Sequence, residues 1–417
     1  MTLFRTSVLN AVSVAVRMLS LLALNKILAI YAGPAGYGIL GQFQNVAQIF
    51  YTAAGTAFAN GVTKYTAEYQ KEPEKQFQVW QNATFWTVAC SSLCGVGIWF
   101  FADTLAVHFL QNNQYGAVFR LFSVTLALYG LNTLLMAVIN GLNAVTLYLK
   151  SSITGSLLSL LVTGSLTYFY GLFGALLALT VHQSLTFFIT LLLCSREPWF
   201  SWRSFVGPVR RAVSTDLSRF ALMAVCSAAF LPVAQLFIRD QIGANLGWEV
   251  AGYWEAMNKL SATYLLFVTS VLSLYYLPRF SSLTNNNELF AELKQGYLWI
   301  IPSLSLMCLG IYFFRDLVIQ MLFSSDFSAA TGLFAWQLTG DVIKMMAWLI
   351  SYLMLSKAMT KVYILSEFAF ALLYYGLSGW AMSVWGIQGV VFSYAASYLV
   401  YWLGISAASY WVLRKAE

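Results

Sequence analysis

The chain has 417 residues, of which 59% are hydrophobic and 9% are charged. Soluble domains carry about 25% charged residues, so this composition, with a mean hydropathy of +0.70, excludes a soluble globular protein and indicates an integral membrane protein. The formal net charge of +7 arises largely in short segments between apolar runs, where it reports membrane topology and argues against nucleic-acid binding.

Twelve apolar runs follow one another, each long enough to cross a bilayer as a helix. They cover approximately residues 5–32, 38–63, 80–102, 117–140, 151–170, 173–194, 217–238, 252–277, 296–314, 329–355, 362–380 and 387–412. Transmembrane β-strands would be shorter and would alternate polar with apolar residues. The sequence therefore predicts an all-α polytopic membrane protein. After the first run, GPAGYG (Gly33–Gly38) predicts a tight outer turn, and because it follows no strand it does not indicate a nucleotide-binding loop.

The basic residues predict the orientation of these spans. If the N-terminus is cytoplasmic, the cytoplasmic segments hold sixteen of the 23 basic residues: Arg5, Lys64, Lys71, Lys75, Lys150, Arg196, Arg203, Arg210, Arg211, Arg219, Arg279, Lys294, Lys357, Lys361, Arg414 and Lys415. The outer segments hold Arg120, Arg239 and Arg315. Cytoplasmic loops are enriched in Lys and Arg, so both termini are predicted to be cytoplasmic.

A weak internal repeat divides the chain in two. AGY occurs at Ala35–Tyr37 and again at Ala251–Tyr253, 216 residues later. Six spans per repeat give both halves the same orientation. We therefore expect two parallel six-helix lobes, 1–195 and 217–417, around a central cavity. The basic linker 196–216 is expected to lie on an anionic leaflet, with docking of a partner as the alternative.

Seven ionisable residues fall within the spans. Each costs roughly 2.5–3.5 kcal/mol at mid-membrane depth, so such residues normally face a bundle interior or a wet cavity. They are Arg17, Lys26, Glu255, Lys259, Asp341, Lys344 and Glu367.

Two pairs of these residues can neutralise themselves along one helix. Glu255 and Lys259 are four residues apart, and Asp341 and Lys344 are three apart, which are helical neighbour spacings. An internal ion pair and a role in binding are both open for each pair. Glu367 is expected to pair with a cytoplasmic-end base such as Lys357 or Lys361, or else to serve as a protonatable coupling group.

No acidic residue lies in any apolar core of the first half that could pair with Arg17, so a bound anion is its expected partner. Lys26 is nine residues away and turns to the opposite helix side. It either snorkels or binds the same anion around a bend. Gln44 and Gln48 share a face with Tyr51, and this set suits sugar hydroxyls and ring faces, with helix–helix hydrogen bonding as the alternative.

Motifs for covalent or metal chemistry are not apparent in the sequence. The five cysteines all fall in apolar runs and are expected to be core residues. There is no Walker motif, Ser/His/Asp set or metal-ligand cluster. The sequence thus predicts no enzyme activity, no cofactor and no metal.

Several stretches together resemble the Wzx-type flippases of the polysaccharide branch of the multidrug/oligosaccharidyl-lipid/polysaccharide exporter superfamily. They are GPAGYG at Gly33, NGVTKY at Asn60, LPVA at Leu231, LPRFSSLT at Leu277, FAWQLTGDVIK at Phe334 and YILSE at Tyr363. The resemblance covers nearly the whole chain. It implies translocation of an undecaprenyl-diphosphate-linked oligosaccharide across a bacterial inner membrane, the sugar being a repeat unit of enterobacterial common antigen, O-antigen or lipooligosaccharide. A polysaccharide polymerase and a chain-length regulator are the implied partners, besides membrane lipids.

The resemblance implies a role for each of the ionisable residues within the spans. Arg17 would hold phosphate, assisted by Lys259 or Lys344 and with Lys26 as a further candidate, while Gln44 and Gln48 would contact sugar. Asp341, Glu255 and Glu367 are the candidates for coupling to an ion or proton gradient. The alternatives are a cation-coupled multidrug exporter of the same fold, a membrane glycosyltransferase or polymerase, a non-transporting scaffold, and a lipid II-type flippase.

Overall fold

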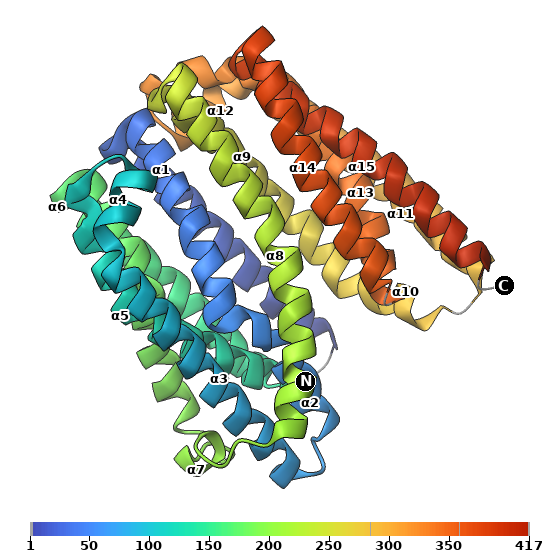
Figure 1. Ribbon diagram of the computed structural model, residues 1–417. Helices are drawn as coiled ribbons and strands as arrows, with labels where there is room; N and C mark the ends of the chain where they lie inside the picture. The colour runs from blue at the N-terminus through green and yellow to red at the C-terminus, as the bar shows by residue number, and fades with distance from the viewer. Residues whose placement is uncertain (1–2, 284, 358, 416–417) are drawn as a thin grey trace. The chain divides into compact units, whose positions relative to one another are not determined.

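The computed structural model describes residues 3–283, 285–357 and 359–415, and this part of the chain is helical almost throughout (Figure 1). Eight of its helical segments are long and apolar enough to cross a membrane. The prediction of an all-α, multi-pass membrane protein is therefore confirmed. Two of the eight segments are longer than one bilayer crossing, because each contains a sharp break.

Both breaks occur at a glycine with a left-handed φ angle. Gly33 has φ of 64° within α1 (Leu3–Tyr51), and Gly171 has φ of 55° within α6 (Val145–Cys194). Only glycine adopts this region without strain, and Pro34 suits the first position of the helix that resumes after Gly33. GPAGYG is thus a one-residue break between two helices, where the sequence predicted a turn. Each break divides its helix into two of the predicted spans.

The N-terminal unit comprises residues 3–32 and 39–232. Its elements are α1, the π-helix η1 (Thr52–Thr56), α2 (Ala57–Glu68), α3 (Pro73–Phe100), α4 (Ala102–Leu110), η2 (Asn113–Tyr115), α5 (Gly116–Gly141), α6, α7 (Trp202–Phe205) and the first part of α8 (Arg211–Leu246). Helix α5 packs against both α3 and α6.

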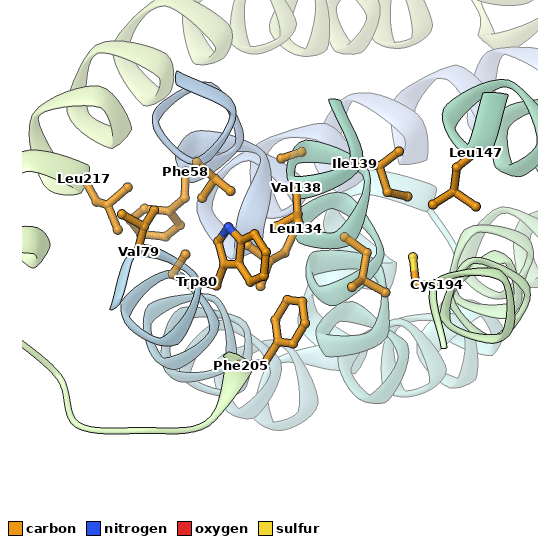
Figure 2. Packing of buried hydrophobic residues seen from close by; sticks show 14 residues of the cluster. Phe58, Val79, Trp80, Leu134, Val138, Ile139, Leu147, Cys194, Phe205 and Leu217 are labelled. Carbon is orange, nitrogen blue, oxygen red and sulfur yellow. The ribbon is translucent and has the colours of Figure 1, made fainter. Parts of the chain in front are cut away.

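The linker between the halves packs onto this unit. Figure 2 shows Trp80 of α3 and Phe205 of α7 in one hydrophobic cluster with Leu217 of α8. The Trp80 and Phe205 rings are stacked with centroids 5.5 Å apart, and the Trp80 indole donates a hydrogen bond to the Thr66 hydroxyl at 2.9 Å. Residues 196–216 are therefore held by α3.

Asn82 of α3 fixes the end of the linker. This buried side chain accepts hydrogen bonds from the Arg210 backbone N–H and the Ser214 hydroxyl, each at 2.9 Å. Asn82→Ala is expected to cost about 1–3 kcal/mol of local stability, because both donors lose their acceptor. Limited trypsinolysis after Arg210 should be faster in this variant. The control Thr84→Ala, which removes a hydroxyl bonded to its own helix, should be cleaved at the wild-type rate. Equal cleavage rates in the Asn82→Ala and Thr84→Ala variants would contradict the anchoring role of Asn82.

The C-terminal unit comprises residues 33–38 and 233–417, described to 415. Its elements are the end of α8, α9 (Trp248–Val271), the π-helix η3 (Leu272–Tyr276), α10 (Leu277–Ser282), α11 (Asn286–Phe313), α12 (Arg315–Leu322), η4 (Ser325–Leu333), α13 (Phe334–Ser356), α14 (Thr360–Trp385) and α15 (Ile387–Lys415). Helix α13 is the centre of the unit, packed against α11 and α15.

The predicted twelve spans are all accounted for in the described residues. The eight long apolar segments with their two breaks supply ten spans. Helix α8, and α9 with its continuation through η3 and α10, supply the other two. The tenth span, predicted to cover 329–355, lies in the apolar segment Ser325–Ser356, whose first residues form the 3-10 helix η4.

The same order of elements occurs in each half. A long helix runs through a five-residue π-helix, η1 or η3, into α2 or α10. The helix that follows, α3 or α11, ends at a Phe-Phe-x-Asp sequence whose Asp lies in the first turn of a short helix, α4 or α12. The AGY repeat predicts this correspondence. The lobe bounds 1–195 and 217–417, and the central cavity, stay predictions; α8 itself runs unbroken from Arg211 to Leu246.

Candidate functional site

Asp341 lies at the centre of the C-terminal unit and is fully buried. Its carboxylate accepts hydrogen bonds from three hydroxyls: Ser261 at 2.5 Å and Tyr264, both on α9, and Tyr394 on α15 at 2.8 Å. Gln337, one turn earlier on α13, donates to the Ser261 hydroxyl at 3.0 Å. Three donors compensate much of the cost of burying a carboxylate. Asp341 thus ties α13 to α9 and α15.

Lys344 follows Asp341 by one turn but is not paired with it. Within the described residues no carboxylate oxygen lies within 4 Å of its ammonium group. The ammonium instead lies near three aromatic rings: Trp348 at 5.0 Å, Tyr398 at 5.7 Å and Tyr394 at 6.0 Å from the centroids. These are cation–π distances. The internal ion pair, one of the two open interpretations of this pair, is therefore absent, and the side chain is half-buried.

Glu367 is held by a tyrosine rather than by a base. The Tyr401 hydroxyl donates to its carboxylate at 2.6 Å and lies 3.1 Å from the Ser351 hydroxyl. The expected ion pair with Lys357 or Lys361 is absent from the described residues, and the Lys357 ammonium donates instead to the backbone oxygen of Leu283. The pairing hypothesis for Glu367 was therefore wrong.

The Glu255–Lys259 ion pair is present, but it is not the main contact of Glu255. Lys259 lies 3.5 Å from the carboxylate, and Arg239 of α8 donates to its other oxygen at closer range. Arg239 is fully buried and stacks over Trp254 at 5.1 Å. Assigning Arg239 to an outer connecting segment was therefore wrong: it is an interior residue of α8, neutralised by Glu255.

Arg17 and Lys26 lie on the first half of α1, in the N-terminal unit. Arg17 is exposed, and no acidic group of the described residues lies within 4 Å of its guanidinium. Lys26 is half-buried. Gln44 is also half-buried and Gln48 is exposed. Beside them the Tyr51 hydroxyl donates to the Leu179 backbone oxygen at 3.2 Å. The substrate roles of these residues stay predictions.

The tyrosines of α15 were missed by the sequence analysis. Tyr394, Tyr398 and Tyr401 are spaced four and three residues apart, which places them on one helix face. That spacing was the available signal. Together with Asp341, Lys344 and Glu367 they form what we call the Asp341–Glu367 network, a set of hydroxyls, two carboxylates and one cation on α13, α14 and α15.

A model of the polysaccharide biosynthesis protein family matches residues 5–284. Lipid III flippases of Escherichia coli (strain K12) and Shigella flexneri are each 29% identical over 405 residues, covering 96% of this chain and 96% of each relative.

Solved structures with the same fold include an inward-facing MATE family multidrug resistance transporter of the MOP superfamily, with a TM-score of 0.77 and 15% identity over 96% of both chains. The lipid II flippase MurJ in an inward closed conformation has a TM-score of 0.69 and 13% identity over 97% of this chain and 87% of that one. These likenesses establish the fold. Since the family model spans more than half of its length, the chain belongs to the polysaccharide biosynthesis protein family.

Proposed function

We propose that this protein is a flippase that moves a lipid-linked oligosaccharide across the membrane in which its helices lie. The observation that carries the proposal is the similarity, over nearly the full length, to flippases of lipid III, joined to membership of the polysaccharide biosynthesis family. A fold shared with another lipid-linked precursor flippase agrees with it.

The proposed substrate is an oligosaccharide carried on undecaprenyl diphosphate, moved from the cytoplasmic to the periplasmic leaflet of a bacterial inner membrane. The repeat unit would be that of enterobacterial common antigen, O-antigen or lipooligosaccharide. Both termini are proposed to be cytoplasmic, from the distribution of Lys and Arg. A polysaccharide polymerase and a chain-length regulator are the proposed partners.

The anionic head group needs cations within the membrane, because bringing a diphosphate into an apolar medium without partners is costly. We assign that role to Arg17, assisted by Lys26, Lys259 and Lys344. Arg17 and Lys344 support the assignment best, since neither has a carboxylate partner among the described residues. Gln44 and Gln48 are the proposed sugar contacts.

Transport would proceed by alternating access of the two lobes, with the lipid tail left in the bilayer. Asp341, Glu255 and Glu367 are the proposed coupling residues. Asp341 and Glu367 accept hydrogen bonds from hydroxyls on neighbouring helices, so a change in their protonation would alter contacts between helices. Glu255 is bound to Arg239, which favours a structural role for it. On this proposal the protein is a transporter and not an enzyme.

A multidrug exporter is the second candidate, because the fold is shared with MATE transporters. The full-length similarity to lipid III flippases supports it less. Efflux of an organic cation by reconstituted protein, without movement of the lipid-linked sugar, would favour the exporter.

Arg17→Ala is expected to slow flipping by about 10- to 100-fold, because one hydrogen-bonded contact to a charged group is lost. The measurement is protein-dependent transfer of a fluorescent polyprenyl-diphosphate oligosaccharide from one leaflet of a vesicle to the other. Lys150→Ala, which removes an exposed cation at the start of α6, is the matched control. Wild-type flipping by Arg17→Ala would refute the phosphate role of Arg17, and no flipping by the wild type would refute the proposed function.

A further inference from the structure

A groove lies between α11 and α13 on the C-terminal unit. Its volume is about 460 Å³, and it is lined by Ser305, Cys308, Leu309, Tyr312, Ala335, Leu338, Thr339, Val342 and Ile343. Cys308 and Leu338 are buried and form its floor, while Leu309 and Thr339 are exposed on its rim. The Thr339 hydroxyl is bonded to the backbone of its own helix. The groove therefore offers an apolar surface.

The groove runs inside the thickness of the membrane. Both of its walls belong to segments that are long and apolar enough to span a bilayer. A volume of this size holds on the order of fifteen groups the size of a water molecule or a methylene. That matches one phospholipid acyl chain and is far too small for a long polyprenyl tail.

Helix α12 marks the membrane surface at one end of the groove. It follows α11 directly and exposes Leu317 and Met321, four residues apart and so on one face, while Ile319 is buried. A short helix with such an apolar face lies in the plane of the membrane interface. Its first residue, Arg315, is therefore at the level of the lipid head groups.

Arg315 is held at the mouth of the groove. Its guanidinium donates to the backbone oxygen of Tyr312 at 3.1 Å and lies 4.7 Å over the Tyr312 ring, and Tyr312 is itself a lining residue. Arginine has five N–H donors, and among the described residues Arg315 forms no ion pair, its neighbour Asp316 included. In the matching helix α4, Asp103 instead pairs with Arg120 at 2.5 Å.

We propose that the groove between α11 and α13 binds one acyl chain of an anionic phospholipid, with Arg315 bonded to the lipid phosphate. The apolar walls, the volume and the cation at head-group depth each match one part of that molecule. The site is distinct from the proposed flipping pathway and would hold a resident lipid rather than a cargo.

The test uses purified, delipidated protein in detergent, with thermal stability followed as phosphatidylglycerol or phosphatidylcholine of identical chains is added. Phosphatidylglycerol should raise the Tm of the wild type more than phosphatidylcholine does. Ala335→Trp, which fills the groove, should abolish the response to both lipids. Arg315→Gln should weaken the apparent affinity for phosphatidylglycerol about tenfold or more, because a charge-assisted hydrogen bond is lost. It should weaken the affinity for phosphatidylcholine less, because the choline cation already offsets the charge of the phosphate in that lipid.

Leu306→Trp is the matched control, since Leu306 is exposed on α11 but does not line the groove; it should respond as the wild type does. The proposal is overturned if Ala335→Trp and Arg315→Gln respond to phosphatidylglycerol like the wild type. It is also overturned if polyprenyl phosphate stabilises the protein in an Ala335-dependent manner while phosphatidylglycerol does not, which would assign the groove to the tail of the transported lipid.

Discussion

Glu255→Gln is expected to lower the stability of the folded protein by about 3–5 kcal/mol, because it leaves the buried Arg239 guanidinium without its carboxylate. Both side chains of this pair are almost completely inaccessible, with 2% and 5% of their surface exposed. Lys259, the other base near Glu255, is 32% exposed and can turn to solvent. The destabilisation should appear as a lower apparent Tm in detergent and as faster irreversible inactivation on heating.

Two further variants test whether a buried charge without its partner is the cause of the lost stability. Replacing both Arg239 and Glu255 by methionine removes the two charges together, so the double variant should recover most of the lost stability. Arg120→Gln breaks a similar ion pair with Asp103 whose side chains are 44% and 53% exposed, and it should cost less than about 1 kcal/mol. A double variant as unstable as Glu255→Gln would mean that packing around Trp254, and not charge, accounts for the effect.

Lys344→Met should reduce flipping by about 10- to 100-fold and leave stability nearly unchanged. The loss of transport follows from the loss of one cation that contacts phosphate. Stability should hold within about 1 kcal/mol, because the substitution removes cation–π contacts with Trp348, Tyr394 and Tyr398, each worth about 0.5–2 kcal/mol, but also removes the cost of an unpaired charge within the membrane.

The measurement pairs the vesicle flipping assay with the apparent Tm of the same preparation. Lys344→Arg keeps the charge and should retain part of the transport. The control, Lys357→Met, removes a cation bonded to the Leu283 backbone oxygen and should flip at the wild-type rate. If Lys344→Met lost stability in proportion to activity, Lys344 would be a structural residue and its role in binding substrate would be refuted.

The membrane spans and the repeat of the two halves could be predicted because they depend only on local properties of the chain. Each span must satisfy its own backbone hydrogen bonds in the bilayer, so about twenty apolar residues suffice to predict a helix. The AGY repeat at Ala35–Tyr37 and Ala251–Tyr253 predicted two halves with one order of elements, and the second π-helix and second short helix follow it. The glycine break at Gly33 was read as a turn, because a left-handed φ does not by itself say whether helix resumes.

The presence of buried charges was also evident from the sequence, whereas their partners were not. Helical spacing allows Asp341 to meet Lys344, yet its carboxylate is bonded to Tyr264 and Tyr394, which are 77 and 53 residues away. In the same way Glu255 meets Lys259 as spacing predicts, but Arg239, 16 residues earlier, is the closer partner. Partners on the same helix compete with partners on neighbouring helices, and the outcome depends on which faces pack together.

The sequence by itself determined the class of protein, the number of spans and the short set of ionisable residues that must be satisfied inside the membrane. Those features follow from transfer free energies, which each residue carries wherever it is placed. Only the tertiary structure decided that Asp341 is satisfied by hydroxyls, that Arg239 is an interior residue and that the Lys344 ammonium group lies over aromatic rings. These outcomes depend on the packing of α8, α9, α13 and α15, because a hydrogen bond between helices forms only when two faces are brought within about 3 Å.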